Sequence, residues 1–151
     1  MKTKKNRENT EQTKMVFENT CPGCAAGMQE VKDSLVFLVN GEEVIVPDSP
    51  HLLCQKCGEI MMRLDESRKL REKALELYRG KYKLLFADEI LSLRERLDLT
   101  QAELAELLRL GVNTISRWES GRNVQTAAMD VLLRLVRDVP GSLEYLRKRA
   151  A

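Results

Sequence analysis

The chain has 151 residues, of which 43% are hydrophobic and 32% are charged, and its formal net charge is +2. This length supports one ordinary core or two small ones, and a change of composition near residue 58 favours two. No apolar run approaches the ~20 residues of a membrane-spanning helix, and the N-terminal residues lack the apolar core of a secretion signal, so we expect a cytoplasmic protein.

Residues 1–20 are mostly polar and charged. Their apolar cluster is Met15, Val16 and Phe17. Such a segment buries too little apolar surface to offset the entropy that is lost on ordering. We therefore predict a disordered arm over residues 1–20.

Residues 21–64 are predicted to form a small zinc-binding β module. Two CxxC pairs, Cys21-Pro-Gly-Cys24 and Cys54-Gln-Lys-Cys57, each offer two thiolates to one tetrahedral ion. In a reducing compartment such pairs hold metal more often than they form disulfides. Because four thiolates leave no open position for water, we predict one structural Zn²⁺ ion, with His51 outside its ligand set.

A β-hairpin is predicted between the cysteine pairs. Residues 31–39 are rich in apolar and β-branched side chains, Asn40-Gly41 is a two-residue turn signal, and residues 44–46 continue the pattern. The two prolines in residues 47–50 are expected to end the strand before the second cysteine pair.

Residues 65–87 are predicted to form a connecting helix and linker. Leu70, Ala74, Leu77 and Tyr78 recur at helical spacing among charged residues. Gly80 is expected to end this helix as its C-cap.

Residues 88–151 show helical patterns and no strand signal, which predicts an all-α domain after the β module and an α+β chain of two domains. The four or five expected helices cover about Asp88 to Leu97, Gln101 to Arg109, Asn113 to Ser120, Thr126 to Val139 and Ser142 to Arg149. Thr100 and Glu103 form a capping box before Gln101. Gly111 is expected to permit the sharp turn of a helix-turn-helix.

The third of these helices carries side chains suited to a DNA major groove. Ile115 and Trp118 are predicted to point inward, which leaves the opposite face to Asn113, Thr114 and Arg117. Asn pairs with adenine, Arg pairs with guanine, and Thr contacts a thymine methyl or a phosphate. The predicted DNA-binding residues are Asn113, Arg117, Thr114, Gln101 at a phosphate, and Arg122 in a local basic patch.

Two helix-turn-helix copies usually bind a palindrome together, so we expect a homodimer on double-stranded DNA. Apolar residues of 127–139, followed by Leu143 and Leu146, offer more surface than three short helices can bury. Part of that surface is expected to pack within the domain.

The run Leu99-Thr-Gln-Ala-Glu-Leu-Ala, followed by Ile115-Ser-Arg-Trp-Glu-Ser-Gly121, resembles the Cro/repressor class of helix-turn-helix. Combined with the upstream CxxC pairs, it resembles the MqsA family of type II antitoxins. The resemblance implies that residues 21–64 bind a ribonuclease toxin and that residues 88–151 dimerise and bind the operon's own promoter. It also implies that Asn113 and Arg117 contact bases.

The sequence departs from that family pattern in its twenty-residue arm and in its longer connector, residues 65–83. One alternative function is a stand-alone zinc-containing helix-turn-helix repressor without a toxin partner. An enzyme would have to use His51 with a carboxylate such as Asp48. No nucleophile, base and orienting group occur together, so we expect no catalytic residues.

Overall fold

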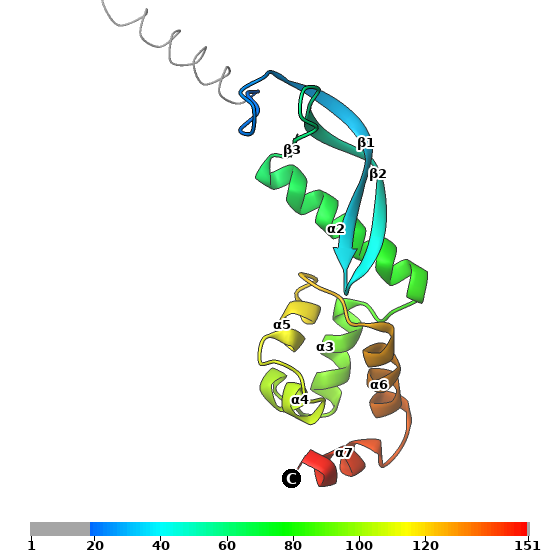
Figure 1. Ribbon diagram of the computed structural model, residues 1–151. Helices are drawn as coiled ribbons and strands as arrows, with labels where there is room; N and C mark the ends of the chain where they lie inside the picture. The colour runs from blue at the N-terminus through cyan, green and yellow to red at the C-terminus, as the bar shows by residue number, and fades with distance from the viewer. Residues whose placement is uncertain (1–18, 151) are drawn as a thin grey trace, which may run out of the picture. The chain divides into compact units, whose positions relative to one another are not determined.

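The computed structural model describes residues 19–150, and the predicted arm lies almost entirely outside them. A three-stranded sheet precedes a series of helices, which confirms the predicted α+β fold (Figure 1). The chain divides into two compact units. The first contains the described residues up to Leu35 together with Ile45–Leu70, and the second contains Val36–Val44 together with the chain from Arg71 onward.

The sheet has the order β1 (Met28–Val39), β2 (Glu42–Cys54) and β3 (Ile60–Met61). Asn40 and Gly41 have φ values of 52° and 82°. Two successive positive φ values are those of a type I′ hairpin turn, so the predicted hairpin is confirmed. Before β1, Thr20 bridges to Gly27, so pairing begins within the last residues of the range assigned to the arm.

Strand β2 continues through residues 47–50, so the predicted strand break is wrong. Asp48 takes a positive φ of 51°, and the buried Ser49 hydroxyl donates to the Val46 carbonyl at 2.8 Å. These features bend the strand without ending it. Strand β3 pairs with Leu52 and Leu53, beyond both prolines, so its ladder needs no amide hydrogen from Pro47 or Pro50.

Helix α2 (Leu64–Tyr82) passes through Gly80, so the predicted C-cap at Gly80 is wrong. Lys83 instead takes the left-handed conformation, with φ 51°. Its amide donates to the Gly80 carbonyl at 3.3 Å, and the Leu84 amide donates to the Arg79 carbonyl at 3.1 Å. These bonds satisfy carbonyls at the helix end, which offsets the cost of a left-handed lysine.

Five helices follow, in agreement with the sequence: α3 (Ala87–Arg96), α4 (Gln101–Leu107), α5 (Thr114–Glu119), α6 (Ala127–Asp138) and α7 (Ser142–Ala150). None of the described helices is long and apolar enough to cross a membrane. Their core contains Leu85, Ile90, Leu93, Leu99, Leu104, Ala105, Leu108, Ile115, Trp118 and Leu133. Side chains from α3, α4, α5 and α6 therefore share one interior.

The turn between α4 and α5 is built differently from the prediction. The predicted capping box is confirmed, because the Glu103 amide donates to Thr100 Oγ1 and the Thr100 amide donates to Glu103 Oε2. The left-handed residue that ends α4, however, is Arg109, with φ 54°, and Gly111 has no positive φ. The glycine is therefore not required by the backbone conformation of the turn.

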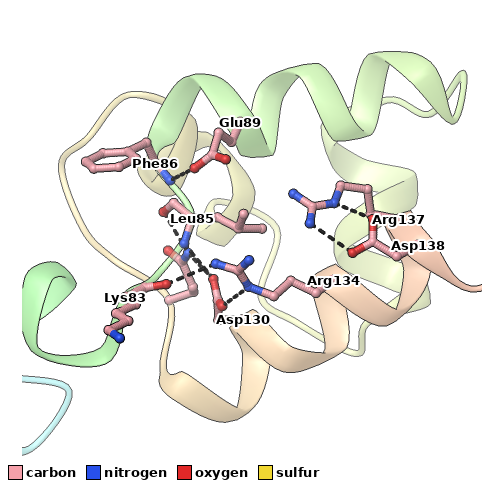
Figure 2. Close-up of polar contacts among 9 residues, drawn as sticks. Lys83, Leu85, Phe86, Glu89, Asp130, Arg134, Arg137 and Asp138 are labelled. Atoms are coloured by element: carbon pink, nitrogen blue, oxygen red, sulfur yellow. Dashed lines mark hydrogen bonds and ion pairs between the residues drawn. The ribbon is translucent and has the colours of Figure 1, made fainter.

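A buried carboxylate joins the linker after α2 to α6. Asp130, which is 4% exposed, accepts hydrogen bonds from the Leu85 amide, from Gln125 Nε2 and from Arg134 Nε. Arg134 also donates to the Lys83 carbonyl at 2.9 Å. Figure 2 shows these side chains converging on the linker. They fix the start of the helical domain.

Candidate metal centre and nucleic-acid interface

The four cysteines of the two CxxC pairs meet in one cluster. Their Sγ atoms all lie within 4.8 Å of one another, and the closest pairs are Cys21 with Cys57 at 3.4 Å and Cys24 with Cys54 at 3.5 Å. A tetrahedral ion with bonds of about 2.3 Å to sulfur holds its ligands about 3.8 Å apart. The observed spacing therefore fits one four-coordinate metal ion.

Each CxxC pair is held by a tight backbone turn. The Ala25 amide donates to the Cys21 carbonyl at 2.9 Å, and the Gly58 amide donates to the Cys54 carbonyl at 2.9 Å. Both donors take positive φ values, 56° at Ala25 and 77° at Gly58. A Cβ at Gly23 would lie 3.8 Å from Cys21 Sγ, which is an ordinary contact, so the space there does not require glycine.

The thiols of the cluster differ sharply in acidity. Backbone amides at Cys57 and Lys56 lower the pKa of Cys54 to about 6, against the opposing effect of burial. At Cys57 the Glu59 amide lowers the pKa, but hydrogen bonds with the other three thiols outweigh it and raise the pKa to about 12. Four thiolates this close repel one another, so a bound cation is needed to hold all four ionised.

His51 lies outside this cluster, as expected. Its side chain is buried, at 4% exposed, and Nδ1 lies 2.8 Å from the Ser49 carbonyl oxygen. The histidine therefore packs within the bend of β2.

Helix α5 has the two faces that the sequence predicts. Ile115 and Trp118 are buried in the core, at 0% and 4% exposed. Asn113 and Arg117 are exposed, and Thr114 is half-buried. The solvent-facing side of this helix therefore carries an amide, a hydroxyl and a guanidinium group.

A network that the sequence did not reveal neutralises the acid of α5. Arg94 Nε donates to Glu119 Oε1 at 2.6 Å, and the side chains of this pair are 14% and 6% exposed. Gln101 Nε2 donates to Glu119 Oε2 at 2.6 Å. The carboxylate is therefore compensated within the domain and lies mostly out of the solvent that an approaching polyanion would occupy.

Arg122 of the predicted basic patch and Arg109, which follows α4, are exposed and make local contacts. Arg122 Nε donates to Ser120 Oγ at 2.9 Å, just after α5. Arg109 Nη2 donates to the Arg149 carbonyl at 3.2 Å and so joins the end of α4 to α7. The guanidinium of Arg122 remains beside the end of α5.

Part of the outer surface of α6 is apolar. Val131 and Leu135, one helical turn apart, are 58% and 47% exposed, and Val139, the extended residue that follows the helix, is 47% exposed. Leu133 and Val136 on the same helix are buried in the domain. Only part of the apolar surface of α6 is therefore used inside the domain.

Comparisons with known proteins agree with this combination of parts. The family model described as the antitoxin component of bacterial toxin-antitoxin system, MqsA, matches residues 19–147. The chain is 28% identical over 130 residues to Antitoxin MqsA of Escherichia coli (strain K12), a match that covers 84% of this chain and 98% of that protein. It is also 36% identical over 59 residues to Antitoxin HigA-2 of Vibrio cholerae serotype O1, which covers 39% of this chain and 57% of that protein.

An antitoxin is a regulatory component of its system and not an enzyme. The resemblance inferred from the cysteine pairs and the helix-turn-helix is confirmed. This chain belongs to the MqsA family, the antitoxin components of bacterial toxin-antitoxin systems.

Proposed function

We propose that this antitoxin neutralises a ribonuclease toxin through its cysteine module and represses its own operon by binding a palindromic operator through α5. The DNA-binding part of this proposal rests on the polar face of α5. Asn113 and Arg117 are exposed there, and Glu119 is neutralised by Arg94. Amide and guanidinium groups on one helix face are suited to adenine and guanine edges in the major groove. Thr114, Gln101 and Arg122 would make the accompanying backbone contacts.

The metal of the cysteine module is proposed to be one structural Zn²⁺ ion. Four cysteine ligands favour zinc over the harder cations, which prefer oxygen. When bound, the ion would hold the two CxxC turns together, with Cys21, Cys24, Cys54 and Cys57 as its ligands. A closed shell of four protein ligands supports a structural role.

The operator-bound form is proposed to be a homodimer. Val131 and Leu135 on α6, together with Val139 directly after it, form an apolar surface that a second copy of the domain would cover. A twofold dimer of this kind presents two copies of α5 to the two halves of a palindrome.

The first experiment measures binding of the full chain to a promoter fragment from its own operon and to a shuffled duplex of equal length. Asn113→Ala should cost about 1 to 3 kcal/mol of promoter binding, because a bidentate base contact is lost, and should leave shuffled-duplex binding unchanged. Gln29→Ala, which removes an exposed amide on β1, is the matched control. Equal loss on both duplexes would show that Asn113 does not contact bases.

A further inference from the structure

Two side chains beside the turn of the β1–β2 hairpin are buried, whereas the turn residues Asn40 and Gly41 are exposed. Val39 and Val44, on either side of the turn, are 2% and 8% exposed. Val36 and Ile45, farther along the same strands, are 58% and 63% exposed. Residues 36–44 also belong to the same compact unit as the helical domain. The tip is therefore packed within that unit.

Two side chains of the tip make specific polar contacts with the helical part of the unit. Asn40 Nδ2 donates to the Val124 carbonyl at 3.3 Å. Glu42 forms an ion pair with Lys81 and accepts a hydrogen bond of 2.5 Å from the Tyr82 hydroxyl. These bonds with Lys81 and Tyr82 lower the pKa of Glu42, so the carboxylate stays charged at neutral pH.

The loop contacted by Asn40 directly follows the proposed recognition helix. The Asn123 amide donates to the Arg117 carbonyl at 3.1 Å, and Val124 and Gln125 are both 1% exposed. Gln125 in turn donates to the Leu85 carbonyl and to Asp130. The loop is therefore held on one side by the hairpin tip and on the other by the linker network of Figure 2.

We propose that Asn40 and Glu42 are positioning residues for DNA recognition. Together they act as a brace that holds the loop after α5, so that Arg117 and its neighbours keep the orientation that binds the operator. The proposal rests on the proposed function, because it concerns the same helix. Without the brace, fewer molecules have the binding-competent orientation at any moment, and the apparent affinity falls by that fraction.

The test compares wild type, the double variant Asn40→Gly with Glu42→Gln, and the control Glu43→Gln. Glycine readily takes the positive φ of position 40, and it lacks the side chain that carries the amide. Glu43→Gln makes the same charge change at the adjacent exposed residue. Each full chain is titrated with the promoter fragment and with the shuffled duplex at several salt concentrations. Amide NMR signals of Arg117, Asn123 and Val124 are recorded in parallel.

The double variant should lose about three- to tenfold in promoter affinity, the size expected for one or two partly exposed polar contacts. Its affinity for the shuffled duplex and its salt dependence should not change, whereas the Asn123 and Val124 signals should shift. The control should match wild type in every measurement. This pattern identifies positioning, since partial unfolding would weaken binding to both duplexes.

The brace is overturned if the double variant keeps the wild-type promoter affinity, if it loses affinity for both duplexes equally, or if Glu43→Gln loses as much. Failure of the proposed function would be recognised separately. In that case the wild-type chain itself would bind the promoter fragment and the shuffled duplex with equal affinity. The brace proposal would then be contradicted as well.

Discussion

Asp130 stabilises the junction between α2 and the helical domain through the hydrogen bonds that it accepts. Burial raises its pKa, but the hydrogen bonds from Arg134, the Leu85 amide and Gln125 together lower it below the usual value. The folded state therefore favours the ionised carboxylate. This contribution to stability is present above the unfolded pKa of about 3.9 and is lost as the pH falls through the lower folded pKa.

Asp130→Asn should lower the free energy of unfolding by about 1 to 3 kcal/mol at pH 7, because the amide cannot accept from every donor that the carboxylate satisfies. The difference from wild type should shrink only below about pH 4, where the wild-type carboxylate itself becomes protonated. Urea unfolding at a series of pH values measures both effects. A difference that stayed constant down to pH 2.5 would show that the charge of Asp130 is not what stabilises the junction.

Contacts between distant residues were beyond the reach of local sequence patterns. Arg94 and Glu119 lie 25 positions apart, and Leu85 and Asp130 lie 45 apart. An acid or a base on a helix is usually solvated, so nothing local marked these side chains as buried. The one local hint was the spacing of Asp130 and Arg134, which form an ion pair across one helical turn.

At the scale of elements, three consecutive helices end on left-handed residues that are not glycine. Lys83, Asp98 and Arg109 follow α2, α3 and α4 with φ values of 51°, 53° and 54°. The sequence instead suggested Gly80 and Gly111 as the residues that end or turn these segments. Glycine is favoured at such positions but not required, because the hydrogen bonds of the helix end offset the strain of another residue.

Asp98→Gly should therefore raise the free energy of unfolding by roughly 0.5 to 1 kcal/mol, since it removes left-handed strain at an exposed helix end. Thermal and urea unfolding of the full chain measure the change. Asp98→Ala, which has a Cβ and no local hydrogen-bonding group, is the control and should destabilise the chain. If glycine is no more stable than alanine, the strain assigned to Asp98 is absent.

Strongly periodic or paired patterns predicted their elements well. The Asn40-Gly41 turn, the capping box at Thr100 and the five C-terminal helices are all found. The bend at residues 47–50 was not predicted, because proline and aspartate signal a strand end as readily as a bend. The cysteine cluster follows from the CxxC spacing, which brings two thiols together locally in each pair.

At the scale of the whole molecule, the metal should hold the cysteine module together without being needed by the helices. A chelator should therefore remove the dispersed NMR signals of residues 21–57 and leave those of α3 to α7 in place. Adding one equivalent of Zn²⁺ should restore the lost signals. Signals of the module that survive complete metal removal would show that its fold does not depend on the ion.

The central claim, that this antitoxin binds a ribonuclease toxin through its cysteine module, is tested most directly by co-purification. The tagged full chain is expressed from its native operon beside the variant Cys21→Ser with Cys54→Ser, which removes two of the four metal ligands. Circular dichroism and the NMR signals of α3 to α7 check that the helical domain of the variant is intact.

We predict that the protein encoded beside the antitoxin co-purifies with wild type and is lost from the variant. Once separated from the antitoxin, it should cleave RNA, and adding wild-type antitoxin should stop the cleavage. If no partner co-purifies with wild type, or if the partner binds the variant equally well, the claim is contradicted.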